Sequence, residues 1–577
     1  MAQKSNEKKA FKVVIDGSGG IDARVRHGQD PCMTDIVNFK ILPDGSLKKR
    51  AGYRKIYSFG ESIRAVWCGK IGGIRKNIFL IGSSIYTIDL TSGMPNYHGS
   101  ILTSDGKADF FYFSDTLYLI DGESIYEITE EYPKLVEGYV PLLGKDWPMG
   151  VAGEINEPLN ILNSRARITY RAGDDPVYYL CPMYPVKSIE KIYKNGSLLS
   201  NDSYAYNPTT NLIRVNGVSP GDFFDVSLTF DSSNFLTQRA ALFSCTSASI
   251  FGGINSSRVF LWNGAKKNTI FTSSYVSRDS LLESQKRYSN SSDLYFMDGQ
   301  NFAVGDGRYD VTAIARHYDR LLIFTDGDAW MADSSACSTE EFPVMTINSS
   351  IGCATDNGAL TANNDPITLG KDGIYRWHSN TDELNDCNAY SISSQISSLL
   401  SKDFYKNAII YFNRYSNELW VNERGSDGIV WIYNFTYKVW TKYSGINASF
   451  IFDADGSVGF TDESGIYVFD DTLSEDIIDE NHKSIVASFK TGTIDFDDYE
   501  YKRIKAIHCR GDLKNTDISL SVNTDRGESK SVYLFESAPH AVITRRVSSC
   551  RLKSFHLSLT DNSQSRQTLH RFEIELK

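Results

Sequence analysis

The stretch NIFLIGSSIYTIDL, from Asn77 to Leu90, contains the unit that decides the fold of this chain. An apolar segment is followed by a turn of small residues and then by a second short segment that carries an aromatic residue, Tyr86. Aromatic and β-branched side chains favour strands because they pack well on a pleated surface. Two such segments joined by a turn rich in Gly and Ser predict a β-hairpin.

Units of this kind recur along the chain. We count seven, and in most of them an aromatic residue soon follows the turn: Tyr86, Tyr126, Phe260, Trp330, Tyr375, Trp420 and Tyr467. Several neighbouring units lie about 35 to 50 residues apart, the spacing of four-stranded propeller blades. One blade cannot cover both faces of its own sheet, so repeated blades stack radially round a channel. We therefore predict an all-β β-propeller of six to eight blades, with seven as the best estimate; an ordinary β-sandwich is the alternative.

Three stretches do not follow the repeat. Strands punctuated by Asn-Gly and Pro-Gly turns at 150–234 predict a small β-sandwich inserted between blades. Alternating strands in the C-terminal tail predict a second β-sandwich. In SISSQISSLLSKDFYKNA, from Ser391 to Ala408, helical spacing of apolar residues predicts a lone amphipathic helix, with Ile392, Ile396, Leu399, Leu400 and Phe404 on one face. The predicted division is an N-terminal arm (1–37), the first part of the propeller (38–149), the inserted sandwich (150–234), the rest of the propeller (235–480) and the C-terminal sandwich (481–577).

The composition narrows the class of protein. A net charge of -11 over 577 residues argues against a surface that grips nucleic acid throughout, because phosphate binding depends on Lys and Arg. The nine cysteines are an odd number without CxxC spacing, so they predict neither a zinc ribbon nor a disulfide framework. No stretch of about 18 uninterrupted apolar residues occurs, so we expect no membrane span. The lysine-rich N-terminus carries no recognisable export signal, and synthesis in a reducing cytoplasm is expected.

Common catalytic motifs are not found in the sequence. The sequence has no HExxH, no GxxxxGK[ST] and no GxGxxG between a strand and a helix, and its histidines are scattered singly. FDADGSVGF, from Phe452 to Phe460, resembles half of a calcium loop but lacks the Glu that would complete it, so a hairpin turn is the better interpretation. We therefore predict no catalytic, cofactor-binding or metal-binding residues, no cofactor and no enzymatic activity.

A cationic hairpin lies near the front of the chain. In NFKILPDGSLKKRAGYRKIY, from Asn38 to Tyr57, an Asp-Gly turn joins two extended segments and is followed by Lys48, Lys49 and Arg50. One hypothesis is that this hairpin supplies edge strands that close the propeller ring. The other is that Lys48, Lys49 and Arg50 dock on an acidic partner subunit. The two hypotheses are compatible.

The same region carries a family resemblance. IDARVRHGQDPCMTDIVNFKILPDGSLKKRAGYRKI (Ile21–Ile56) resembles the start of the tail hub or nozzle proteins of tailed bacteriophages, also described as packaged-DNA stabilisation proteins of short-tailed phages. IARHYDRLLIFTDGDAW (Ile314–Trp330), SSIGCATDNGA (Ser349–Ala359), ITLGKDGIYRW (Ile367–Trp377) and WIYNFTYKVWTKY (Trp431–Tyr443) follow in that family's order. The match covers residues 20–60 and 310–577; the insertion lies outside it.

The resemblance implies a structural virion protein: a homo-hexameric ring below the portal and head-to-tail adaptor that lines or closes the DNA channel and retains packaged DNA until ejection. The implied partners are portal or adaptor proteins, tail fibre or needle proteins, and genomic DNA in transient non-specific contact. The implied location is the virion tail, after synthesis in the host cytoplasm. Two alternatives stay open. One is a receptor- or carbohydrate-binding tail protein, and the other is a propeller glycan hydrolase, which requires two carboxylates about 5 to 10 Å apart facing the channel.

Overall fold

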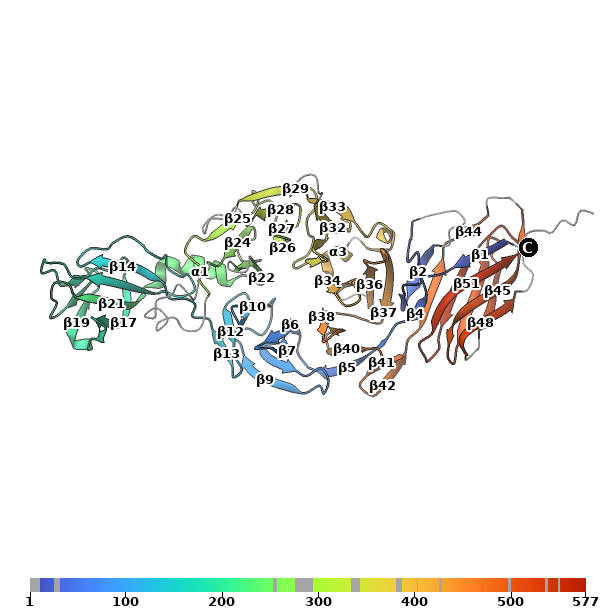
Figure 1. Cartoon of the computed structure of the whole chain (residues 1–577), viewed down its shortest axis with the longest axis horizontal. Helices are drawn as coiled ribbons and strands as arrows, with labels where there is room; N and C mark the ends of the chain where they lie inside the picture. Colours follow the sequence, from blue (N-terminus) through green and yellow to red (C-terminus); the bar gives the residue numbers. More distant parts are fainter. Residues whose placement is uncertain are drawn as a thin grey trace, which may run out of the picture.

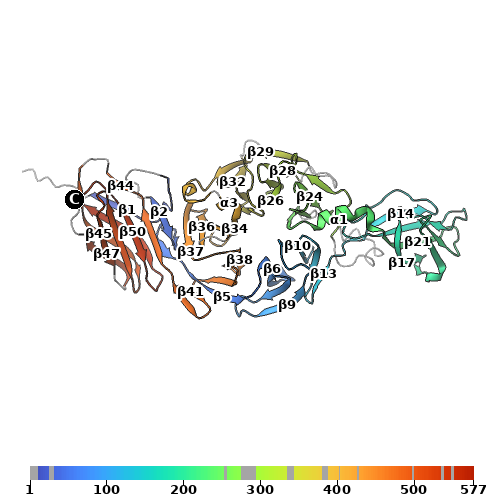
Figure 2. The ribbon, with the colours of Figure 1, turned by 180° about the vertical axis from the view of Figure 1, so that it is seen from behind.

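The molecule is elongated and has three parts in a row (Figure 1). The computed structural model describes residues 11–24, 32–252, 257–274, 294–333, 343–379, 387–401, 403–424, 428–496, 500–534, 538–547 and 551–577. A ring of small sheets occupies the centre, the insertion projects from one side of the ring, and a two-sheet sandwich that contains the C-terminus lies on the opposite side. The view from behind shows the same order (Figure 2).

The central ring is a β-propeller, as predicted. Five of its units are separate four-stranded antiparallel sheets whose strands follow chain order. Their strands are β6 (Ile63–Ile71), β7 (Ile74–Ile81), β8 (Ser84–Ile88) and β9 (Pro95–Ser100); β10 (Asp109–Phe113), β11 (Thr116–Ile120), β12 (Ile125–Ile128) and β13 (Pro133–Leu135); β22 (Ser247–Phe251), β23 (Arg258–Trp262), β24 (Thr269–Thr272) and β25 (Asn301–Ala303); β26 (Val311–His317), β27 (Arg320–Thr325), β28 (Ala329–Asp333) and β29 (Val344–Asn348); and β30 (Ala359–Ala362), β31 (Asp365–Leu369), β32 (Ile374–Ser379) and β33 (Cys387–Ser391).

Two further four-stranded units complete the ring in the described part of the chain. Each of them belongs to a larger sheet. One contains β34 (Ala408–Asn413), β35 (Glu418–Glu423), β36 (Ile429–Asn434) and β37 (Val439–Ser444). The other contains β38 (Phe450–Ala454), β39 (Ser457–Thr461) and β40 (Gly465–Asp470), and its outer strand is β5 (Gly52–Ser58) from the other end of the propeller. β5 pairs antiparallel with β40, so backbone hydrogen bonds close the ring.

The stretch that predicted the fold shows why the units stack. Successive residues of β7 point to opposite faces of its sheet. Ile78 and Leu80 pack in one apolar cluster with Phe110 of the next unit. Phe79, between them, packs in another cluster with Phe452 of the preceding unit, with ring centroids 5.5 Å apart. Because both faces of each sheet are apolar, each sheet requires a neighbour on both sides.

The insertion has a hydrophobic core of its own. One sheet has the order β14 (Leu142–Pro148), β15 (Arg165–Arg171), β21 (Phe223–Phe230), β17 (Val186–Lys194) and β18 (Ser197–Leu198). A smaller sheet has the order β16 (Tyr179–Leu180), β20 (Leu212–Val215) and β19 (Tyr204–Asn207), with η1 (Asn201–Ser203) before β19. Fully buried side chains such as Phe224 and Phe230 lie in this core. The chain returns to the propeller through η2 (Ser232–Phe235) and α1 (Leu236–Phe243).

The C-terminal sandwich takes strands from both ends of the chain. Its first sheet has the order β3 (Phe39–Ile41), β4 (Leu47–Lys49), β51 (Thr568–Leu576), β45 (Lys502–Leu513) and β48 (Ala538–Arg546), with β1 (Phe11–Ile15) on β51 and β49 (Arg551–Leu552) on β45. Its second sheet has the order β2 (Met33–Val37), β43 (Ala487–Thr491), β50 (Ser554–Asp561), β46 (Ile518–Thr524) and β47 (Ser529–Leu534), with β44 (Ile494–Asp495) on β50. The connection from the propeller contains β41 (Glu475–Ile478) and β42 (Asn481–Ser484).

This arrangement corrects the expected boundaries at the N-terminus. Residues 1–37 were expected to form an arm, but β1 and β2, the two strands described there, are strands of the sandwich. The hairpin β3–β4 was assigned to the propeller and also belongs to the sandwich, since β4 pairs with β51. An alternating apolar pattern predicts a strand but does not specify which other strand it pairs with. The hairpin was therefore assigned to the first blade, its neighbour in the sequence, although it pairs with the sandwich.

The predicted amphipathic helix is wrong. The structure has only η4 (Ser397–Leu399) and the short α3 (Phe404–Asn407) there, and Lys402 lies outside the described residues. Serine hydroxyls bond the backbone instead: Ser393 Oγ accepts from Ile374 N, and Ser401 Oγ accepts from Phe404 N. The bond of Ser401 is local, and bonds of this kind compete with a continuous helix, whereas the bond of Ser393 ties this stretch to the preceding blade.

Candidate functional site: the joint between propeller and sandwich

The front hairpin lies where the propeller meets the sandwich. Its predicted Asp-Gly turn is confirmed: Gly45 has φ +79°, and Asp44 Oδ1 accepts a hydrogen bond from Ser46 N at 3.0 Å. β4 then pairs with β51, and β5 begins three residues after β4 ends. Lys48, Lys49 and Arg50 therefore lie where the chain passes from β4 of the sandwich to β5, the strand that closes the propeller ring.

Lys48, Lys49 and Arg50 do not share one environment. Lys48 is half-buried, whereas the side chains of Lys49 and Arg50 are 0 % and 2 % exposed. A docking surface requires accessible charge. The hypothesis that all three residues bind a partner subunit is therefore wrong for Lys49 and Arg50 in this structure.

Lys49 is held inside the sandwich. Its Nζ donates to the carbonyl oxygen of Ser563 at 2.6 Å and lies 3.7 Å from Oδ1 of Asp561, which is also 0 % exposed. Burial lowers the pKa of Lys49 and raises the pKa of Asp561, because each charge has lost its hydration. Each charge therefore depends on the other, and removing one would leave the other buried alone.

Arg50 forms a bidentate ion pair with Asp476 on β41. Its Nη1 and Nη2 donate to the two carboxylate oxygens at 2.8 and 2.7 Å. The guanidinium also lies 5.6 Å from the ring centroid of Tyr53 and 5.9 Å from that of Tyr443. Planar bidentate pairing and aromatic contact are properties of Arg that Lys lacks.

Asn38 also contributes hydrogen bonds to the joint. It has φ +58°, a left-handed conformation that Asn adopts more readily than most residues. Its Oδ1 accepts from Arg50 Nε and from Ser444 N, both at 2.9 Å, and its Nδ2 donates to the carbonyl oxygen of Val486 at 2.7 Å. One side chain therefore links β2, β37 and the entry to β43.

Gly52 permits the closest approach in the joint. A Cβ atom at this position would lie 1.9 Å from the carbonyl oxygen of Glu475 on β41. Asn38, Arg50 and Gly52 all belong to the segment that carries the family resemblance. Each of them has a specific role in the contact between propeller and sandwich. All three residues lie within the quoted segment, but the sequence does not identify Asp476 as the partner of Arg50, Ser444 as the partner of Asn38, or Asp561 as the partner of the neighbouring Lys49.

One blade of the propeller and the second sheet of the sandwich also form one continuous sheet. β2 pairs in parallel with β37 at Val37 and Lys442, and antiparallel with β43, so the blade β34–β37 runs on into the sandwich. Lys442 Nζ and Asp35 Oδ1 form an ion pair across this seam at 2.8 Å. Hydrogen-bonded pairing across the seam resists a hinge between the two parts.

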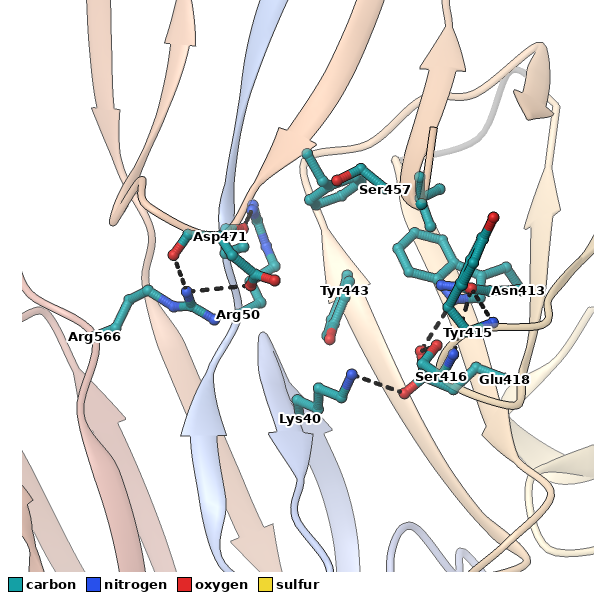
Figure 3. Close-up of a pocket in the computed structure, with 15 residues that line it drawn as sticks. Lys40, Arg50, Asn413, Tyr415, Ser416, Glu418, Tyr443, Ser457, Asp471 and Arg566 are labelled. Carbon is teal, nitrogen blue, oxygen red and sulfur yellow. Dashed lines mark hydrogen bonds and ion pairs between the residues drawn. The ribbon is translucent and has the colours of Figure 1, made fainter. Parts of the chain in front are cut away.

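A cavity of about 220 Å³ lies beside Arg50 (Figure 3). Lys40 Nζ is 3.5 Å from Glu418, and Arg566 Nη1 donates to the carbonyl oxygen of Asp471 at 2.6 Å. Its cations thus face carboxylates or carbonyls. Among the described residues that line it, none is Cys or His. The lining residues are Lys40, Arg50, Ala51, Asn413, Tyr415, Ser416, Glu418, Trp420, Tyr443, Gly456, Ser457, Val458, Phe469, Asp471 and Arg566.

The chain is similar to several solved structures at low sequence identity. No family model and no curated protein matches the chain. Among solved structures, the AfRom2 CNH domain matches with a TM-score of 0.35 and 8% identity, covering 73% of this chain and 99% of that one. The WD40 domain of SCAP from fission yeast has a TM-score of 0.31 and 8% identity, covering 73% and 98%. An exo-β-1,3-galactanase from Phanerochaete chrysosporium has a TM-score of 0.17 and 10% identity, covering 81% and 95%.

These likenesses concern the fold alone and carry no argument about activity. Within the described ranges, no helix has the length and apolar character needed to cross a membrane. The features that bear on function are therefore the joint itself and the sequence resemblance.

Proposed function

We propose that this chain is a structural protein of a bacteriophage tail, a hub or nozzle that forms a homo-hexameric ring below the portal and adaptor. In this role it lines or closes the DNA channel and retains packaged DNA until ejection. The observation that carries the proposal is the joint, because the residues of the phage-like segment are those that fix the sandwich to the propeller. A subunit of a load-bearing ring must keep its parts in fixed orientation.

The charge of the chain supports the same role. A net charge of -11 makes strong binding of DNA along the whole surface unfavourable, since like charges repel. A weakly repelling wall allows DNA to slide, and contact with it stays transient and non-specific. Portal or adaptor proteins on one side, and fibre or needle proteins on the other, are the proposed partners. The proposed location is the virion tail, with no enzymatic turnover.

Sedimentation with capsids tests this assignment. DNA-filled capsids that carry portal and adaptor but lack this protein are mixed with the purified chain and separated on a density gradient. We expect the chain to sediment with filled capsids and to reduce nuclease-accessible DNA. A chain that stays at the top of the gradient and leaves DNA leakage unchanged would refute the tail-ring role.

One observation favours a second candidate, a receptor- or carbohydrate-binding tail protein. Val177, Tyr178 and Tyr179 are 39%, 42% and 40% exposed and adjacent in the insertion, far from the sandwich (Figure 1). Exposed tyrosines can stack on sugar rings, as their apolar faces and hydroxyl groups suit such ligands. Binding of host glycans by the wild-type chain, lost in Y178S/Y179S, would support this candidate; equal signals from both proteins would exclude these tyrosines.

A further inference from the structure

Three side chains that bind metals well meet at one end of the first sandwich sheet. Asp512 lies on β45, His540 on β48 and His570 on β51, and one ligand atom from each lies within 4.8 Å of the other two. Asp512 Oδ1 is 3.0 Å from His540 Nδ1, and Asp512 Oδ2 is 3.7 Å from His570 Nε2. No spacing motif marks this cluster in the sequence, because the three residues come from three different strands.

Irregular strand pairing brings these residues together. The β45–β51 ladder shifts register between Arg510 and Gly511, which leaves His570 without an opposing residue. The β45–β48 ladder shifts between Gly511 and Leu513, which leaves Asp512 without one. Such bulges redirect side chains and are common beside functional sites. His540 also has φ +52°, a rare conformation for a residue other than Gly.

His570 is already oriented by the front hairpin. Its Nδ1 is 2.8 Å from Ser46 Oγ and 3.7 Å from Asp44 Oδ2, so the turn of β3–β4 holds the ring from behind. Its Nε2 faces Asp512. A hydroxyl or carboxylate on the far nitrogen is the usual support of a histidine that ligates a metal, because it fixes the tautomer and the ring plane.

From this geometry we propose that Asp512, His540 and His570 form a binding site for Zn²⁺ or a similar first-row divalent cation. Two imidazoles and one carboxylate are ligands that zinc accepts, with a fourth position left to water. Zinc–ligand bonds near 2.0 to 2.2 Å place ligand atoms about 3.3 to 3.5 Å apart. The separations of 3.0 Å between Asp512 Oδ1 and His540 Nδ1 and of 3.7 Å between Asp512 Oδ2 and His570 Nε2 lie on either side of this range. The three ligand atoms lie within 4.8 Å of one another, so the side chains must rotate to place both imidazoles and one carboxylate oxygen on a single ion. The ion would connect β45, β48 and β51 beside the hairpin that leads to the joint.

Zinc titration of the untagged, chelator-treated full chain tests the site. By calorimetry we expect one Zn²⁺ per chain, no comparable binding of Mg²⁺, and a rise in melting temperature on adding zinc, since a ligand of the folded state stabilises it. Co²⁺ in place of Zn²⁺ should give visible absorption bands of a low-symmetry site. H540A, H570A and D512N should each weaken zinc binding by more than about tenfold, and S46A by about tenfold through the orientation of His570.

The matched control is H482A. His482 is also exposed beside a carboxylate, with its Nδ1 2.7 Å from Glu475 Oε1, but it lies on β42 away from the cluster. It should bind zinc like the wild type. Equal metal-free melting temperatures of H540A and wild type would show that the variant is folded. Absence of one-to-one binding, or binding unchanged in both H540A and H570A, would overturn the proposal.

Discussion

At the scale of single residues, two buried cations lie where the sandwich leads into the propeller. Arg50 and Lys49 are among the largest fully buried side chains of the described chain, and each faces one buried carboxylate. Replacing a whole buried ion pair is often tolerated, whereas deleting one member leaves an uncompensated charge. The joint is therefore sensitive to single substitutions.

Loss of one joint cation should strongly destabilise the protein. We expect R50M and K49M each to lower the free energy of unfolding by about 3 to 5 kcal/mol, because Asp476 or Asp561 is left buried without its partner. Urea denaturation followed by tryptophan fluorescence measures this. K48M is the matched control and should stay within about 0.5 kcal/mol of wild type, since Lys48 is half-buried. Equal effects of all three substitutions would contradict the assigned roles.

Asp109 should make stability depend on pH. This carboxylate, at the start of β10, accepts from Ala248 N at 3.1 Å, and burial raises its pKa to about 7. The folded state therefore holds a proton that the unfolded state releases at its ordinary pKa of 3.8, so stability should fall as pH rises from about 4 to 7. D109N cannot ionise and should lack this component, with a gain at neutral pH on the order of 1 kcal/mol or more. Parallel pH–stability curves for both proteins would exclude it.

At the scale of elements, the joint depends on strands from distant parts of the sequence. β5 closes the propeller against β40 and also pairs in parallel with β41. Gly52 begins β5 and brings it against Glu475. A side chain there would push β41 away and weaken both pairings.

The substitution G52A should loosen ring closure locally. We expect a loss of about 1 to 3 kcal/mol in stability from overpacking, with faster amide hydrogen exchange in β5 and β40 than in β7. G60A is the matched control, because a Cβ at Gly60 has no atom within 4 Å. If exchange in β5 and β40 were the same in G52A as in G60A, Gly52 would have no special role.

Local patterns in the sequence were enough to predict the propeller blades. They were not enough to predict which strands from distant parts of the chain pair with one another. The alternation in NIFLIG is satisfied by neighbours on both faces of β7, so stacking followed from short-range information. The pairing of β4 with β51 joins the two ends of the chain, and nothing within either strand specifies the other. For the same reason the partners of Lys49 and Arg50 and the cluster of Asp512, His540 and His570 were visible only in three dimensions.

At the scale of the whole molecule, a sheet shared by one blade and the sandwich joins the two parts, together with the buried ion pair of Arg50 and Asp476. The ion pair of Lys49 and Asp561 lies within the sandwich. The insertion projects from the opposite side of the ring (Figure 2). This arrangement suits a subunit with a fixed body and one projecting contact domain. The net charge of -11 adds repulsion between copies that salt screens. In the proposed tail role, isolated chains are therefore expected to stay monomeric until a portal or adaptor aligns them.

Electron microscopy of reconstituted particles tests the central claim most directly. DNA-filled capsids with portal and adaptor are incubated with the wild-type chain, and the tail vertex is averaged. The account predicts a closed six-fold ring with an axial channel below the adaptor, with the sandwich and propeller of each copy in the orientation fixed by the joint. A vertex without added density, or the chain found only as isolated monomers or at fibre tips, would contradict it.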